Sequence, residues 1–170
     1  MSISMFQASV PVLIRGLGNL QHIIGKAQAH AAEKQIDPTA LTGARLFPDM
    51  LPFARQIHIA TDTAKGCAAR LADVEAPKFD DVEVTFDELH ARIQKTIDFL
   101  KTFSAAQIDG SEERSITLKM RSGPIEFTGQ NYLLYFALPN FYFHLTTAYD
   151  ILRHNGVEVG KLDYLGKPNA

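Results

Sequence analysis

The sequence predicts an all-α fold, a four-helix bundle with a short β-hairpin between its third and fourth helices. Four segments repeat apolar residues at spacings of three and four, which is the period of one buried helix face. A further segment, 113–128, alternates apolar and polar residues with the period of a strand. The chain has 170 residues, of which 46% are hydrophobic and 21% charged, so we expect one globular domain over residues 1–170.

Composition excludes several classes of protein. The net charge of -2 provides no basic field for nucleic acid or an anionic membrane surface. Cys67 is the only cysteine, so an internal disulfide is impossible, and we expect a buried, inert thiol. The N-terminal segment lacks the features of a signal peptide, and no apolar run is long enough to span a membrane. We therefore expect a cytoplasmic protein.

The first helix is predicted over residues 4–33. Its buried face consists of apolar residues three or four positions apart, namely Phe6, Val10, Leu13, Leu17, Leu20, Ile24 and Ala27. Pro11 lies inside this pattern, and because proline cannot donate a backbone hydrogen bond we expect a bend or a helix start near it. A connection over 34–48 follows, in which Asp37-Pro38 is a turn or helix-start signal.

The second helix is predicted to begin near Pro48 and to end near residue 72. Its face is Met50, Phe53, Ala54, Ile57, Thr61, Ala64, Ala68 and Leu71. His58 lies about 100° around the helix from Ile57, at the edge of this face. Residues 73–84 have no periodicity and form the next connection.

The third helix is predicted from Thr85 to about residue 103. Thr85 and Glu88 match a capping box, in which each residue satisfies a backbone N–H of the other. In the hairpin 113–128 that follows, Ser122-Gly123-Pro124 is the turn signal. Because a two-stranded ribbon is only marginally stable by itself, we expect it to lean on the bundle.

The fourth helix is predicted over Gly129–Gly156. Its face consists of Leu133, Phe136, Ala137, Asn140, Phe141, His144, Ala148, Ile151 and Leu152. Pro139 lies inside the pattern and should kink the helix or loosen its first turns. The three connections, of about 15, 12 and 25 residues, are long for a simple up-down bundle and leave the topology open.

The final segment, HLTTAYDILRHNGVEVG, resembles the last helix of the DinB/YfiT-like metalloenzyme superfamily. The resemblance lies in a histidine followed nine residues later by arginine and then by Gly-Val, here His144, Arg153, Gly156 and Val157. The whole chain further resembles an uncharacterised bacterial family within that superfamily, through SMFQASVPVLIRGLGNL, FPDMLPFARQIHIATDTAKG, GQNYLLYFALPNFYFHLTTAYDILRHNGV and GKLDYLG. The resemblance implies the DinB/YfiT-like bundle, but no established activity.

The resemblance also implies where a metal would bind. In metal-binding members, one histidine from the second helix and an H-x-x-x-H pair from the last helix hold a divalent ion such as Zn²⁺ or Ni²⁺. Here His144 matches the second histidine of the pair, whereas Asn140 stands at the first position. His58 is the second-helix candidate. The implied metal ligands are His144 and His58 with Asn140 assisting, an incomplete site, and the alternative is that no metal is bound.

Two functions therefore stay open. In the first, the protein is a metal-dependent enzyme or binder of a small molecule, with a pocket formed by Asn140, Phe141 and His144. The alternative reading of His144 is a core histidine satisfied by a polar neighbour.

In the second hypothesis, the protein is a non-enzymatic homodimer that has lost the metal site. Tyr135, Tyr142, Tyr149 and Phe143 would form the interface, since aromatic residues are enriched in interfaces. The alternative for these residues is packing against the hairpin and the first helix.

Overall fold

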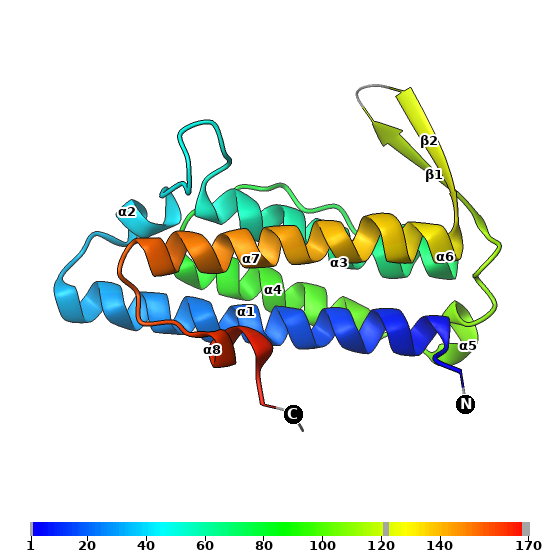
Figure 1. Ribbon diagram of the computed structural model, residues 1–170, viewed down its shortest axis with the longest axis horizontal. Coiled ribbons are helices and arrows are strands. Elements are labelled where there is room, and N and C mark those ends of the chain that lie inside the picture. Colours follow the sequence, from blue (N-terminus) through cyan, green and yellow to red (C-terminus); the bar gives the residue numbers. More distant parts are fainter. Residues whose placement is uncertain (1, 121–122, 168–170) are drawn as a thin grey trace.

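The computed structural model of the protein describes residues 2–120 and 123–167 and shows a bundle of long helices with a hairpin at one end (Figure 1). The long helices are α1 (Met5–Lys34), α3 (Phe53–Ala72), α4 (Phe86–Leu100) and α7 (Leu138–His154). The shorter elements are α2 (Pro38–Thr42), α5 (Ala105–Ile108), β1 (Ser115–Met120), β2 (Gly123–Thr128), α6 (Gly129–Tyr132), the π-helical turn η1 (Leu133–Ala137) and α8 (Lys161–Leu165). None of the helices in these described residues is long and apolar enough to cross a membrane.

One hydrophobic core joins the long helices. α7 packs along α3, α4 packs against both α1 and α3, and α8 covers part of α1. The side chains that are fully buried at the centre come from every long helix and include Leu13, Leu17, Leu20, Ile57, Leu71, Leu89, Ile93 and Phe141. The apolar periodicity of the sequence therefore identified the faces that meet.

The connection between α3 and α4 decides the topology. It runs back along α3, so that Phe79 lies over Lys65 and Asp81 pairs with Arg55 near the start of the helix (Figure 1). A helix of the length of α3 is about 30 Å long. Eleven or twelve extended residues can span this distance. α3 and α4 consequently point in the same direction.

The helix starts follow the caps encoded in the sequence. Ser4 caps α1 in a capping box with Gln7, and Pro11 is accommodated inside the helix. The predicted box at α4 is confirmed, because the Glu88 N–H donates to Thr85 Oγ1 at 3.3 Å and the Thr85 N–H donates to Glu88 Oε2 at 2.9 Å. α4 ends at Leu100 rather than 103.

The predicted start of the second helix near Pro48 is wrong, because α3 begins at Phe53. Pro52 adopts an extended conformation and caps the helix, which excludes the preceding residues from it. The connection before it contains the short helix α2, whose first turn is capped by Asp37 accepting from the Thr39 N–H at 2.9 Å.

The predicted hairpin is confirmed as an antiparallel pair in which Ile116 faces Phe127. Gly123 and Pro124 of the predicted turn belong to β2, and Ser122 lies outside the described residues. Ile116 is buried, and the Phe127 ring lies 5.9 Å from that of Phe136. The base of the hairpin leans on the bundle, while its far end projects beyond it (Figure 1).

The predicted disturbance at Pro139 takes the form of a π-helical turn. Instead of one helix over 129–156, the chain forms α6, the turn η1 and then α7, with Pro139 in the first turn of α7. Proline has no N–H for the carbonyl four residues earlier, that of Tyr135, and its ring would press against that carbonyl. Widening the turn before the proline relieves this conflict.

Candidate functional site

His144 of α7 meets α3 at Gln56. The Nδ1 atom of His144 lies 2.7 Å from Oε1 of Gln56, and the Gln56 amide donates to the Leu51 carbonyl at 2.8 Å. Both side chains are buried. A relay of hydrogen bonds therefore runs from the backbone before α3, through Gln56, to the imidazole.

This relay determines the tautomer of His144. The Leu51 carbonyl can only accept, so the Gln56 amide nitrogen faces it and the Gln56 oxygen faces His144. Nδ1 therefore carries the proton, and Nε2 presents its lone pair. Burial lowers the pKa of His144, which favours this neutral form.

Nε2 of His144 borders solvent. It has no hydrogen-bond partner within the described residues, where the buried polar side-chain atoms without a hydrogen bond are Asp81 Oδ1 and Ser111 Oγ. The ring of Phe143, which is 56% exposed, lies at right angles to the His144 ring with 5.2 Å between centroids. His144 is thus an oriented imidazole, 8% exposed, whose second ring nitrogen is left unpaired among the described residues beside an aromatic ring.

Asn140 and Phe141 have different surroundings. The Asn140 amide donates to Thr63 Oγ1 of α3 at 2.8 Å. Phe141 is fully buried, and its ring passes over Gly16 of α1, where an added Cβ would lie 2.6 Å from the ring. Asn140 therefore lies beside His144 on the side of α7 that faces α3, whereas Phe141 is a core residue against α1.

His58 does not join this site. Its Nδ1 lies 3.2 Å from Arg55 Nη1, and its Nε2 lies 3.1 Å from the carbonyl oxygen of Glu83. Both ring nitrogens are thus used, Nδ1 by Arg55 of α3 and Nε2 by Glu83 of the α3–α4 connection. Burial and then the charge of Arg92 lower the pKa of His58, against the opposing effects of Asp81 and Glu83.

The residues present do not fit the three-histidine centre that the family resemblance implies. The α3 residue that contacts His144 is Gln56 instead of His58, and Asn140 is bonded to Thr63. Over residues 2–120 and 123–167, no three His, Cys, Asp or Glu side chains lie close enough to hold an ion together. An amide oxygen is also a weaker ligand for Zn²⁺ or Ni²⁺ than an imidazole.

Gln56 was missed in the sequence, although a signal for it exists. It lies three residues after Phe53 and four before Ala60, both buried, so it is a polar side chain on the apolar face of a helix. Such a residue must find a partner inside the fold. Arg92 gives the same signal in α4, three residues after Leu89.

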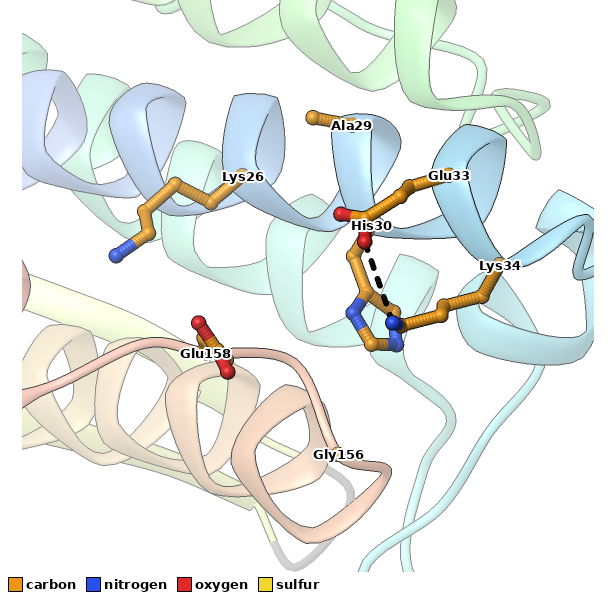
Figure 2. Close-up of a pocket in the computed structure, with 7 residues that line it drawn as sticks. All are labelled: Lys26, Ala29, His30, Glu33, Lys34, Gly156 and Glu158. Atoms are coloured by element: carbon orange, nitrogen blue, oxygen red, sulfur yellow. Dashed lines mark hydrogen bonds and ion pairs between the residues drawn. The ribbon is translucent and has the colours of Figure 1, made fainter.

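A separate cavity of about 300 Å³ lies between the end of α1 and the segment after α7 (Figure 2). Figure 2 shows Lys26, His30 and Lys34 on successive turns of α1, with Glu158 across from them. Lys26 donates to Asp163, and Lys34 pairs with Glu33 at 3.2 Å. Two lysines and two glutamates line the cavity, and the lining includes none of the residues of the His144 site.

The aromatic residues expected at a dimer interface separate into two groups. Tyr135 and Phe143 are 73% and 56% exposed. Tyr149 instead packs edge-on against Tyr164 of α8, with ring centroids 5.9 Å apart, and donates to the Val159 carbonyl. Tyr142 is 37% exposed, and its ring packs edge-on against that of Phe141, with centroids 5.4 Å apart.

Comparison with known proteins places the chain in context. The family described as a domain of unknown function (DUF1993) matches residues 5–165. A crystal structure of a DinB family member protein from Shewanella denitrificans is similar in fold, with a TM-score of 0.89 and 41% sequence identity over 97% of this chain and 93% of that chain. No curated protein matches this chain significantly.

Proposed function

The chain belongs to the DUF1993 family, with the fold of the DinB family, and on that premise we propose that it binds a small molecule at His144 without a three-histidine metal centre. The observation that carries the proposal is the relay from Leu51 through Gln56 to His144, which leaves the Nε2 lone pair facing solvent. A histidine that served only to fill the core would not need one fixed tautomer, nor an Nε2 acceptor that no protein group uses. Orienting hydrogen bonds of this kind accompany histidines that act on a ligand or metal.

The surroundings of Nε2 specify the class of ligand. Asn140 precedes His144 by one helical turn, and its amide nitrogen is used by Thr63, so its carbonyl oxygen is the atom left for a ligand. Two acceptors on one side of a helix suit a molecule with N–H or O–H donors. The exposed ring of Phe143 adds an apolar wall. We expect a small, flat molecule that carries amine or hydroxyl groups and no net negative charge.

A fragment library of aromatic amines and phenols, followed by amide chemical shifts in NMR spectra, tests the proposal. Binding fragments should shift resonances around His144 and should lose at least about tenfold in affinity in His144→Ala, a loss typical of one good hydrogen bond. His30→Ala, at the separate cavity of Figure 2, is the matched control and should bind normally. Fragments that bind elsewhere, or bind His144→Ala equally well, would contradict the proposal.

A second function is favoured by a different observation, the exposure of Tyr135 in η1 and of Phe143 in α7. Both are large apolar rings, 73% and 56% exposed, and exposed apolar side chains of this size can mark an interaction surface. We propose that a second copy of the chain covers it to form a homodimer, in which no catalytic step is required.

Light scattering tests the dimer. The wild-type protein should have the mass of two chains at micromolar concentration, and Tyr135→Lys should have the mass of one. Leu162→Lys, which changes an exposed residue of α8, serves as the control and should remain dimeric. A monomeric wild-type protein would exclude this function but leave the His144 site untouched.

A further inference from the structure

The strap, which we define as residues 74–84 between α3 and α4, is held to the bundle by side chains. All its residues are described, and none lies in a helix or strand. The Val74 N–H bonds to the Ala69 carbonyl, but residues 75–84 make no backbone–backbone hydrogen bond. Attachment of the strap therefore depends on its own side chains and on bundle side chains that bond to its backbone, as His58 bonds to the Glu83 carbonyl.

The first anchor is Phe79. Its ring faces three cations, with Lys65 Nζ, Lys95 Nζ and Arg92 Cζ at 4.6, 4.4 and 5.0 Å from the centroid. Lys65 and Arg92 are themselves buried. Such contacts are strengthened when the cation is removed from water.

The second anchor is a pair of acids. Asp81 pairs with Arg55 at 2.9 Å and with Arg92 at 2.8 Å, and Glu83 pairs with Arg92 at 3.0 Å. The Arg92 side chain is completely buried. Asp81 also has a left-handed backbone, with φ of 55°, which is unfavourable for a residue other than glycine. The ion pairs of Asp81 help to hold the strap in this less common backbone conformation.

His58 lies between Arg55 and Glu83, and it bonds to both only when its imidazole is neutral. Arg55 can only donate, so Nδ1 of His58 must be an acceptor, and the Glu83 carbonyl can only accept, so Nε2 carries the proton. Arg55 uses the same Nη1 atom for His58 and for Asp81. A second proton, on Nδ1, would abolish the bond from Arg55 and place two cations against each other.

We propose that His58 is a pH-sensitive latch, and that its protonation displaces Arg55 and releases the strap from the start of α3. The charged groups that face His58 are Arg55 of α3, Arg92 of α4, and Asp81 and Glu83 of the strap. The Glu83 carboxylate lies 3.3 Å from Nε2 of His58 and would attract the protonated ring. Glu83 and Asp81 are already paired with arginine, however, so they cannot compensate fully for the lost bond from Arg55. A cavity of about 320 Å³ that is already open at the surface is bordered by Arg55, His58, Asp81 and Glu83, and it would widen on release.

The direction of the pH dependence follows from the fact that His58 is buried as a neutral imidazole. An unfolded histidine has a pKa of about 6.5, and that of His58 in the fold is lower. The latch is therefore fully closed above about pH 6.5, and its stabilising contribution is lost as the pH falls from there through the native pKa. The pKa of Asp81 is also below its ordinary value, because its hydrogen bond from Arg55 and the charge of Arg92 outweigh its burial, so Asp81 stays charged in this range.

NMR relaxation tests the latch directly. We expect order parameters of the strap amides to fall from about 0.85 to below about 0.6 as the pH is lowered, with the same midpoint as the His58 imidazole resonance. His58→Gln keeps a donor for the Glu83 carbonyl but cannot be protonated, so its strap should stay ordered. His90→Gln, on α4, is the matched control and should behave like the wild type.

A strap that stays ordered while His58 titrates would overturn the proposal, as would equal loosening in His58→Gln. A His58 that remains neutral down to pH 4.5 would also overturn it. The titration of the wild-type protein is sufficient by itself to test the proposal. The test therefore holds even if His58→Gln does not fold.

Discussion

Nδ1 of His144 and Oε1 of Gln56, 2.7 Å apart, join α7 to α3 through a buried hydrogen bond. The two residues are far apart in the sequence, and neither could satisfy its polar atoms in the core alone. The bond helps to hold α7 against α3, and it sets the tautomer that leaves Nε2 of His144 available.

Replacement of Gln56 by leucine should destabilise the protein. The leucine fills the space but leaves Nδ1 of His144 and the Leu51 carbonyl without their partner, which costs about 1–3 kcal/mol for a buried polar group. Urea unfolding measures the loss. Gln28→Leu, on the exposed face of α1, is the control and should change the free energy of unfolding by less than about 0.5 kcal/mol.

The position of Gln56 also predicts how a metal site could be built. We expect the double variant Gln56→His and Asn140→His to bind Zn²⁺ or Ni²⁺, since it would place three imidazoles around the His144 position. Calorimetry should show one ion per chain. The single variant Asn140→His, which retains Gln56 and His58, is the control. It should bind the ion much more weakly, because His58 faces the strap. Equal binding by the two variants would show that His58 can reach the site.

Replacement by alanine should have opposite effects on stability at two glycines of α1. At Gly16 the new Cβ would lie 2.6 Å from the Phe141 ring, so Gly16→Ala should cost about 1–3 kcal/mol through overpacking. At Gly18 no atom lies within 4 Å, so Gly18→Ala should stabilise the helix by about 0.5–1 kcal/mol. Thermal unfolding of the pair measures both, and a stabilising Gly16→Ala would refute the close approach of α1 and α7.

Removal of the buried Arg92 charge should strongly lower the free energy of unfolding. Arg92→Met leaves Asp62, Asp81 and Glu83 without a cation they share, and breaking a buried ion pair from one side costs about 3 kcal/mol or more. Denaturant unfolding checks the value. Lys95→Met removes a cation that contacts only the outer side of the cluster and should cost less than about 1 kcal/mol; equal losses would mean that burial of Arg92 is unimportant.

Acid should loosen the packing of α8 against α1. The Gly160 N–H, then Lys26 and His22 hold the pKa of Asp163 at about 2. Its stabilising contribution is present above the unfolded value of about 3.9 and is lost as the pH falls from there towards 2. Amide exchange of 161–165 should rise over this range relative to α4, and Asp163→Asn should show the faster exchange already at pH 6.

Much of the fold was predictable because the signals are local. The apolar faces of the four helices, the box of Thr85 with Glu88 and the alternation in the hairpin each depend on residues a few positions apart. The start of α3 was mispredicted because Pro52, rather than Pro48, sets the boundary. The resemblance at His144 pointed correctly to the DinB family but could not identify the partners of His144.

The sequence by itself determined that this protein is a helical bundle with a histidine and an asparagine on the buried side of its last helix. Only the tertiary structure decided that Gln56 rather than His58 meets His144, and that the strap returns along α3 to make α3 and α4 parallel. The reason is physical. Periodicity fixes which residues share a face, whereas the rotation and direction of one helix against another arise from packing between segments that are distant in the chain.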